Sequence, residues 1–146
     1  MPASREVTLL YLIKQVELAV RARLDDAVGS AGLTPLQYTA LTVLERRPGL
    51  TSAELARNSF VRAQTMAQMI GFMEAKGLLR RETDQNSRRQ FLLFLTERGS
   101  ATIDVLRPAV DEVERDLVDG LTSAQVAELR ETLWSARQRL GGSPSH

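Results

Sequence analysis

The sequence has 146 residues, 43% of them hydrophobic, and a formal net charge of +1 at pH 7. That length and apolar share predict a single globular domain with one packed core. Since the chain contains no cysteine, disulfides, thiolate metal sites and thiol redox switches are excluded. The apolar run at 7–13 is only seven residues long, and charged residues follow it at helical spacing. We therefore expect neither a transmembrane helix nor a signal peptide, and a cytoplasmic location.

The small net charge hides an uneven distribution along the chain. Between residues 57 and 98 there are eight Arg or Lys against four Asp or Glu, whereas between residues 104 and 131 there are three against eight. Because the Debye length at physiological salt is only about 8 Å, a bound polyanion responds to local charge. The middle of the chain is therefore basic and its C-terminal part acidic, in spite of the balanced total.

The first predicted element is a long amphipathic helix over about residues 5–28, which Gly29 and Gly32 end. Apolar residues recur along it at steps of three and four: Leu9, Ile13, Val16, Val20, Leu24 and Val28. Further apolar residues widen this face beyond one stripe: Leu10, Leu12, Leu18, Ala19 and Ala27. A face of this width predicts packing against more than one partner, and a second subunit is a plausible one.

Three later helices are predicted to begin with a capping box, in which Thr is followed three residues on by Glu or Gln. These pairs are Thr34 with Gln37, Thr51 with Glu54, and Thr122 with Gln125. In each pair the Thr oxygen accepts from the amide three residues on, while the Glu or Gln side chain reaches back to the Thr amide. The run Arg-Pro-Gly at 47–49 then ends the helix that starts after Thr34.

A short helix after Thr51, a turn through Ser59 and Phe60, and a second helix over about 62–76 predict a helix-turn-helix. The second helix buries a stripe formed by Met66, Met69, Ile70 and Met73. Its opposite face is polar and almost free of acid, and it carries Arg62, Gln64, Thr65 and Gln68. Such a face is typical of a recognition helix that meets base edges in a major groove, although a solvated helix surface has the same composition.

The segment 78–96 predicts a β-hairpin with a cationic tip. Two short apolar runs flank a polar loop whose shoulders carry Arg80, Arg81, Arg88 and Arg89. Paired arginines on a protruding hairpin suit phosphates or a narrow minor groove. Together with the helix-turn-helix, this order predicts a mainly α-helical winged-helix protein that binds DNA.

Two helices complete the chain, one from Thr96 towards Asp119 and one from Thr122 to about Leu140. Their apolar seams are Ile103, Leu106, Val110, Val113 and Leu117, and Val126, Leu129, Leu133, Ala136 and Leu140. Pro108 removes a hydrogen bond within the first of them and predicts a kink or break nearby. The tail 141–146 is expected to be disordered.

These features resemble the MarR family of bacterial transcription regulators. The wing motif of that family is Asp, any residue, Arg, three residues, Leu, any residue, Leu, Thr. This spacing falls on Ser87, Arg89, Leu93, Leu95 and Thr96, so that four of five positions match. The departure is Ser87, which has no charge with which to brace Arg89.

The resemblance implies a single domain over 1–140 and a homodimer. Segments 5–30 and 100–140 would form the dimerisation helices, through Leu9, Ile13, Val16, Val126, Leu129 and Leu133, and 34–96 the winged-helix lobe. By position, Arg62, Gln64, Thr65 and Gln68 would face the major groove, and Arg88 and Arg89 would make the wing contact. The family also implies an inverted-repeat operator, repression, and release by a small phenolic or aromatic ligand, for which Tyr38 is the candidate contact.

Two other classes of function fit the sequence less well. An enzyme is disfavoured because the only histidine is His146 at the end of the chain, so that no histidine triad or histidine metal site can form. We accordingly expect no metal and no cofactor. The other alternative is a winged-helix module that binds protein instead of DNA, which the wide apolar first helix and the acidic C-terminal part would suit.

Overall fold

The computed structural model describes residues 6–141, and the tail predicted at 141–146 lies outside this range except for Gly141. The described chain forms six helices and one two-stranded antiparallel sheet. In chain order the elements are α1 Leu9–Gly29, α2 Pro35–Arg46, α3 Ser52–Asn58, α4 Ala63–Ala75, β1 Leu79–Asp84, β2 Ser87–Leu95, α5 Glu97–Leu117 and α6 Ser123–Leu140. This confirms the predicted mainly α-helical fold with a β-hairpin.

Helix starts follow the predicted caps closely. All three capping boxes form both of their hydrogen bonds, at the first turns of α2, α3 and α6. Helix α1 starts later than expected, because the Thr8 side chain accepts from the Tyr11 amide at 3.2 Å and caps the helix there. The sequence-based start near residue 5 was therefore wrong by about one turn.

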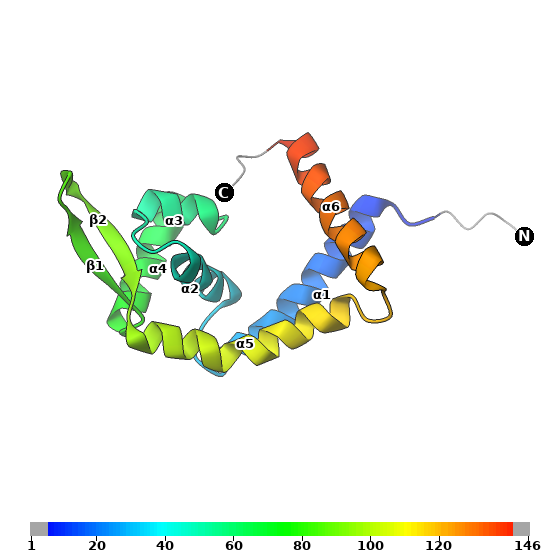
Figure 1. The fold of residues 1–146 in the computed structure, drawn as a ribbon, viewed down its shortest axis with the longest axis horizontal. Helices are drawn as coiled ribbons and strands as arrows, with labels where there is room; N and C mark the ends of the chain where they lie inside the picture. Colours follow the sequence, from blue (N-terminus) through cyan, green and yellow to red (C-terminus); the bar gives the residue numbers. More distant parts are fainter. Residues whose placement is uncertain (1–5, 142–146) are drawn as a thin grey trace, which may run out of the picture.

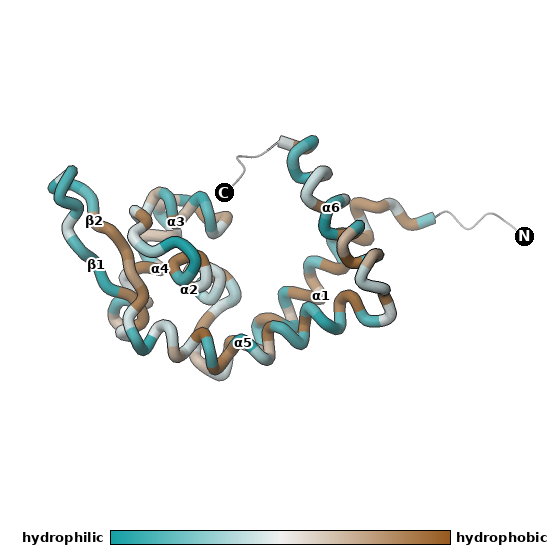
Figure 2. The backbone as a smooth tube through the Cα atoms, viewed as in Figure 1, coloured by the Kyte–Doolittle hydropathy of each residue, from teal (hydrophilic) through white to brown (hydrophobic). Residues whose placement is uncertain are grey.

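The hairpin is attached to the helical lobe by its base. Its register pairs Leu79 with Leu95 and Thr83 with Phe91, and an irregularity follows Thr83 near the tip. Leu50 forms an isolated β-bridge with Leu93. The main-chain amide of Gly49 donates to the Leu93 carbonyl and that of Leu93 donates to the Leu50 carbonyl, both at 2.9 Å. Figure 2 shows a hydrophobic base and a hydrophilic tip, so the tip projects without a core of its own.

The core lies within the lobe formed by α2, α3, α4, the hairpin base and the first half of α5. Its largest fully buried side chains are Leu41, Leu44, Leu55, Met66, Met73, Leu79, Leu93 and Ile103. Helices α1 and α6 and the second half of α5 extend away from this lobe as an arm (Figure 1). Helix α5 thus belongs to both parts and joins them.

Helix α5 continues through Pro108 without a break. It changes direction near its middle, as the ribbon shows (Figure 1), in line with the expected kink. The proline ring removes one main-chain donor, but neighbouring turns hold the helix together. Helix α5 therefore joins the lobe to the arm as one continuous helix.

Candidate nucleic-acid interface

The predicted helix-turn-helix is formed by α3 and α4. The turn between them is closed by main-chain hydrogen bonds from the Ser59 amide to Leu55 and from the Val61 amide to Ala56, at 2.9 and 3.1 Å. Phe60 holds a positive φ of 62° in this turn, a conformation that is uncommon for a residue with a large side chain. The tight turn sets α4 at an angle to α3 and brings its N-terminal end to the surface.

The two faces of α4 differ as the sequence predicted. Met66, Met69, Ile70 and Met73 are buried in the lobe. Arg62, Gln64, Thr65 and Gln68 are all exposed. Arg62 is the N-cap residue and makes no side-chain capping bond, so its guanidinium is not used to close the helix.

The hairpin arginines fall into two pairs with different surroundings. Arg80 forms an ion pair with Glu82 and lies over the Phe94 ring, 4.7 Å from its centre. Arg81 forms an ion pair with Glu74 of α4 at 3.1 Å. Both guanidinium groups are therefore partly neutralised and held against the hairpin, and the Arg81 pair also ties the wing to α4.

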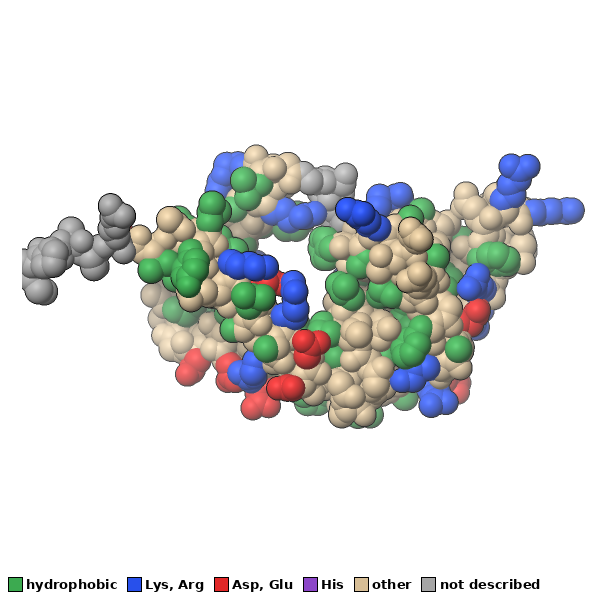
Figure 3. Space-filling view, turned by 180° about the vertical axis from the view of Figure 1, so that it is seen from behind, with side chains coloured by type: hydrophobic (Ala, Val, Ile, Leu, Met, Phe, Trp, Pro, Cys, Tyr) green, Lys and Arg blue, Asp and Glu red, His purple; other side chains and the backbone are tan. Residues whose placement is uncertain are grey.

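By contrast, Arg88 and Arg89 are exposed and have no ion-pair partner among residues 6–141. The tip between the strands is organised by Asp84, whose carboxylate accepts from the Asn86 amide at 2.9 Å. Seen from behind, basic side chains project from the hairpin end of the molecule (Figure 3). Two unpaired guanidinium groups at a projecting tip suit contact with phosphates.

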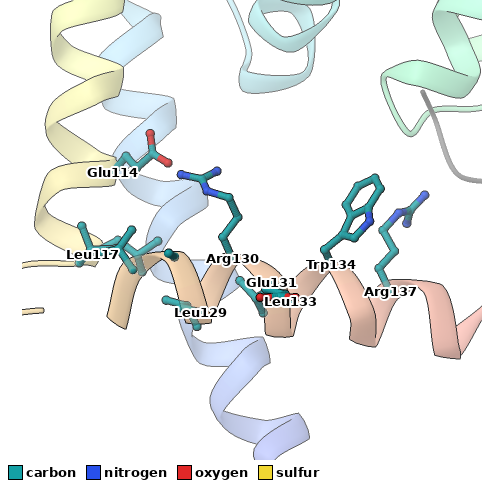
Figure 4. Close-up of a pocket in the computed structure, with 11 residues that line it drawn as sticks. Glu114, Leu117, Leu129, Arg130, Glu131, Leu133, Trp134 and Arg137 are labelled. Carbon is teal, nitrogen blue, oxygen red and sulfur yellow. The ribbon is translucent and has the colours of Figure 1, made fainter. Parts of the chain in front are cut away.

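The arm exposes apolar side chains that the lobe does not cover. Leu9, Ile13 and Leu133 are 76%, 59% and 55% exposed. A groove of about 630 Å³ runs between the end of α5 and α6, with Leu117, Leu129 and Trp134 among its lining residues. Figure 4 shows Trp134 and the guanidinium groups of Arg130 and Arg137 on one side of α6.

A second groove, also of about 630 Å³, lies between α1 and the start of α2. It is lined by Ile13, Val16, Val20 and Leu24 from α1, with Thr34, Pro35, Leu36 and Thr39 on the other side. Tyr38 of α2 is not among the residues that line this groove. Its side chain is 8% exposed and packs in the core. Burial raises the pKa of the Tyr38 hydroxyl above its ordinary value of 10.0, and nearby Arg107 opposes that rise.

Two ion pairs join α5 to other helices, one to α2 of the lobe and one to α1 within the arm. Arg107 of α5 donates to both carboxylate oxygens of Glu45 on α2, at 2.7 and 2.8 Å. Arg23 of α1 donates to Asp116 of α5 at 2.7 Å. Their partners raise the pKa of both arginines. The partners in these pairs are separated by 62 and 93 positions in the sequence, so no local pattern in the sequence predicted them.

The part of the chain that the structure covers has no cluster of three or more histidine, cysteine or acidic residues that could hold a metal ion. Within the same residues, no helix combines the length and hydropathy needed to cross a bilayer.

Comparison with known proteins places these features in one family. A family model described as "MarR family" matches residues 31–90, which span α2 to the start of β2. The HTH-type transcriptional repressor Rv2887 of Mycobacterium tuberculosis is 30% identical over 128 residues, which cover 88% of this chain and 92% of the relative. The aligned region thus includes the arm as well as the lobe.

Solved structures agree with this assignment. The transcriptional repressor CouR, bound to a 23-mer DNA duplex, matches with a TM-score of 0.81 and 28% identity over 89% of this chain and 93% of its own. Rv2887 in complex with salicylic acid matches with a TM-score of 0.69 and 30% identity over 94% of this chain and 98% of its own. From its helix-turn-helix, its wing and these relationships, the chain belongs to the MarR family of winged-helix transcriptional regulators.

Proposed function

We propose that the protein is a transcriptional repressor that binds an inverted-repeat DNA operator as a homodimer. The observation that carries the proposal is the joint exposure, on one lobe, of an acid-free polar helix face and two unpaired wing arginines. A surface of this charge attracts the phosphate backbone, while the polar face offers hydrogen bonds to base edges. Repression would follow from occlusion of a promoter, and chromosomal DNA as partner implies a cytoplasmic location.

The site residues divide into two groups under this proposal. Arg62, Gln64, Thr65 and Gln68 enter the major groove, where amide and guanidinium groups distinguish adenine and guanine from other bases. Arg88 and Arg89 hold the flanking backbone or minor groove, which positions the lobe without specifying sequence. Since the family is one of regulators and this surface needs only hydrogen bonds and charge, we propose no catalytic role and no cofactor.

A second subunit would cover the exposed arm. Segments 5–30 and 100–140 form the proposed dimerisation region and 34–96 the DNA-binding lobe. The apolar residues on α1 and α6 supply the contact: Leu9, Ile13, Val16, Val126, Leu129 and Leu133. Twofold symmetry would then present two α4 helices to successive half-sites of one DNA face.

We also propose that a small aromatic or phenolic ligand regulates the dimer. The related Rv2887 has been solved with salicylic acid. In this chain the groove between α1 and α2 is a suitable size for such a ligand, and Tyr38 is buried on the same helix, α2, close to Arg107 of α5. Ligand titrations of Tyr38→Phe and Tyr38→Ala test the role of this residue, and unchanged affinity in both variants would remove it from the site.

The function is tested by footprinting the protein across its own neighbouring intergenic region, followed by gel shifts at two salt concentrations. A repressor should protect an inverted repeat, and each phosphate neutralised should steepen the log–log salt dependence by roughly 0.9. A protein that binds no duplex at about 0.15 M salt would instead be a protein-binding module. The exposed apolar arm would support a protein-binding module only if the lobe binds no DNA.

A further inference from the structure

Lys76 connects the C-terminal end of α4 to the turn between α1 and α2. Its Nζ donates to the main-chain carbonyl oxygens of Ala31 and Gly32, at 3.1 and 3.4 Å. The same ammonium lies 5.2 Å from the centre of the Phe72 ring, one helical turn earlier on α4. The side chain is therefore directed onto the turn, and its charge is shared between two carbonyl dipoles and an aromatic face.

The turn is shaped to receive this ammonium. After α1 ends, the amides of Ala31 and Leu33 bond back to the Val28 carbonyl at 3.1 and 3.3 Å, and the Gly32 amide bonds back to Gly29 at 2.9 Å. These bonds use the amides of the turn and leave the Ala31 and Gly32 carbonyls for Lys76. Gly32 has a φ of +72°, and a Cβ there would lie 2.7 Å from Nζ.

The start of α5 holds the same end of α4. Thr96 donates its hydroxyl to the Gly77 carbonyl, and its amide bonds to the Leu78 carbonyl at 3.2 Å. The turn that follows α1 and the residue that caps α5 are therefore both bonded to the C-terminal end of α4. Its other end carries Arg62 and Gln64, and the 13 residues of the helix separate the two ends by about 20 Å.

Lys76 therefore bonds the lobe, in which Met66 and Met73 bury α4, to the turn at the base of α1. A small rotation of the lobe about this contact moves the base-reading end of α4, which lies at the far end of the helix, through a larger distance. In a twofold dimer the two lobes are placed by their arms, so the separation of the two α4 helices depends on how firmly each lobe is held at this turn. B-DNA advances about 3.4 Å per base pair, so that a change of one base pair between half-sites is resolved only by a firmly held helix.

We propose that Lys76 is a positioning residue that orients α4 relative to the arm and thereby sets the half-site spacing that the dimer accepts. The proposal rests on the proposed function, since it requires two α4 helices on one operator. Lys76 contacts no base: its ammonium bonds to the α1–α2 turn at the end of α4 opposite the reading residues.

The test uses the full-length protein and three duplexes: the footprinted operator, and the same half-sites with one base pair added or removed between them. Lys76→Met keeps the length of the side chain and its packing on Phe72 but removes every donor. The wild-type preference for native spacing should fall by about three- to tenfold in this variant, which is the scale of one ordinary intramolecular hydrogen bond. Lys76→Arg, which can donate to both carbonyls, should keep the preference.

The matched control is Lys14→Met, which removes the only other lysine of the chain. Lys14 lies on α1 and pairs with exposed Glu17 at 3.4 Å, away from α4. This variant should retain the wild-type preference for native spacing. Circular dichroism melts establish that each variant is folded at the assay temperature, and Lys76→Leu, which also lacks a donor, replaces Lys76→Met if the latter is not.

Three results would overturn the inference: a wild-type protein indifferent to spacing, an unchanged preference in the neutral Lys76 variant, or an equal loss in Lys14→Met. A loss of affinity for all three duplexes by the same factor counts as an unchanged preference, since general destabilisation leaves their ratio unchanged. If wild-type protein binds no duplex at all, the proposed function itself fails. The two failures are thus distinguishable.

Discussion

Arginine side chains on the hairpin differ in what they can bind, because intramolecular partners occupy two of them. Arg80 and Arg81 are held by Glu82 and Glu74. Within the described chain, Arg88 and Arg89 have neither a carboxylate nor an aromatic ring as partner. A guanidinium that must first leave a carboxylate gains less from a phosphate, so the tip pair carries the proposed wing contact.

Arg89→Ala should weaken binding to specific and nonspecific duplexes alike, and should lower the magnitude of the log–log salt slope by about 1. The reason is that a phosphate contact releases counterions without reading sequence. Affinities measured by fluorescence anisotropy over a salt series give both quantities. Arg115→Ala, which removes an exposed charge from α5 on the arm, is the control and should leave the slope unchanged.

Gln64→Ala should act differently, because under the proposed function the Gln64 amide on α4 pairs with one base edge. Discrimination at one base pair should change by about 1 to 3 kcal/mol, with little effect on the salt slope. Binding to a set of operators substituted one position at a time measures this. If Gln64→Ala and Arg89→Ala weaken all duplexes equally, the division into reading and positioning residues is wrong.

At the scale of elements, local capping decides where the helices of the lobe begin. Thr51 and Glu54 form a complete capping box at the start of α3, the first helix of the helix-turn-helix. The hydrogen bond from the Thr51 side chain, followed by that from its main-chain amide, lowers the pKa of Glu54 below the ordinary 4.5. The ionised carboxylate is therefore the form that the folded protein prefers.

This preference makes stability depend on pH in a defined direction. Since the folded pKa is lowered, the contribution of Glu54 is fully present above 4.5 and is lost as the pH falls through the folded value. Glu54→Gln keeps a side-chain acceptor for the cap but cannot ionise. Its free energy of unfolding should fall less steeply than that of the wild type below pH 4.5, in urea titrations at several pH values. Parallel curves for the two proteins would contradict this assignment.

At the scale of the whole molecule, one chain supplies a core for the lobe but not for the arm. Buried residues concentrate in α2 to α5 and the hairpin, whereas α6 has none. Apolar side chains on α1 and α6 are instead exposed to solvent in the single chain. Apolar surface of this extent is typical of an interface with another chain.

Leu133→Glu should convert the proposed dimer into a monomer. The substitution places a charge on α6, where apolar contacts with α1 or α6 of the second subunit would form. Sedimentation or size exclusion with light scattering measures the mass, and affinity for the full operator should fall by about two orders of magnitude or more once the half-sites bind separately. Ala75→Glu is the control: Ala75 is exposed on α4, outside segments 5–30 and 100–140, and this variant should remain dimeric. A dimeric Leu133→Glu would move the interface elsewhere.

The sequence by itself was enough to predict most helix boundaries, the polar face of α4, the hairpin and the family motif around Arg89. Caps, turns and apolar periodicity act over three to four residues, so a linear pattern contains them. The cap at Thr8 is equally local, but the expected start near residue 5 passed over it. It could have been predicted by the same rule.

Only the tertiary structure decided which charged groups remain available and which are already paired. Nothing in the sequence joins Arg107 to Glu45, Arg81 to Glu74, or Lys76 to the carbonyls of the α1–α2 turn. The burial of the Tyr38 side chain on α2 could likewise not be predicted from the sequence, because a tyrosine on an amphipathic helix can face the core or a groove. Such contacts join segments that are distant in the chain, and they exist only because packing of the core brings α1, α2, α4 and α5 together.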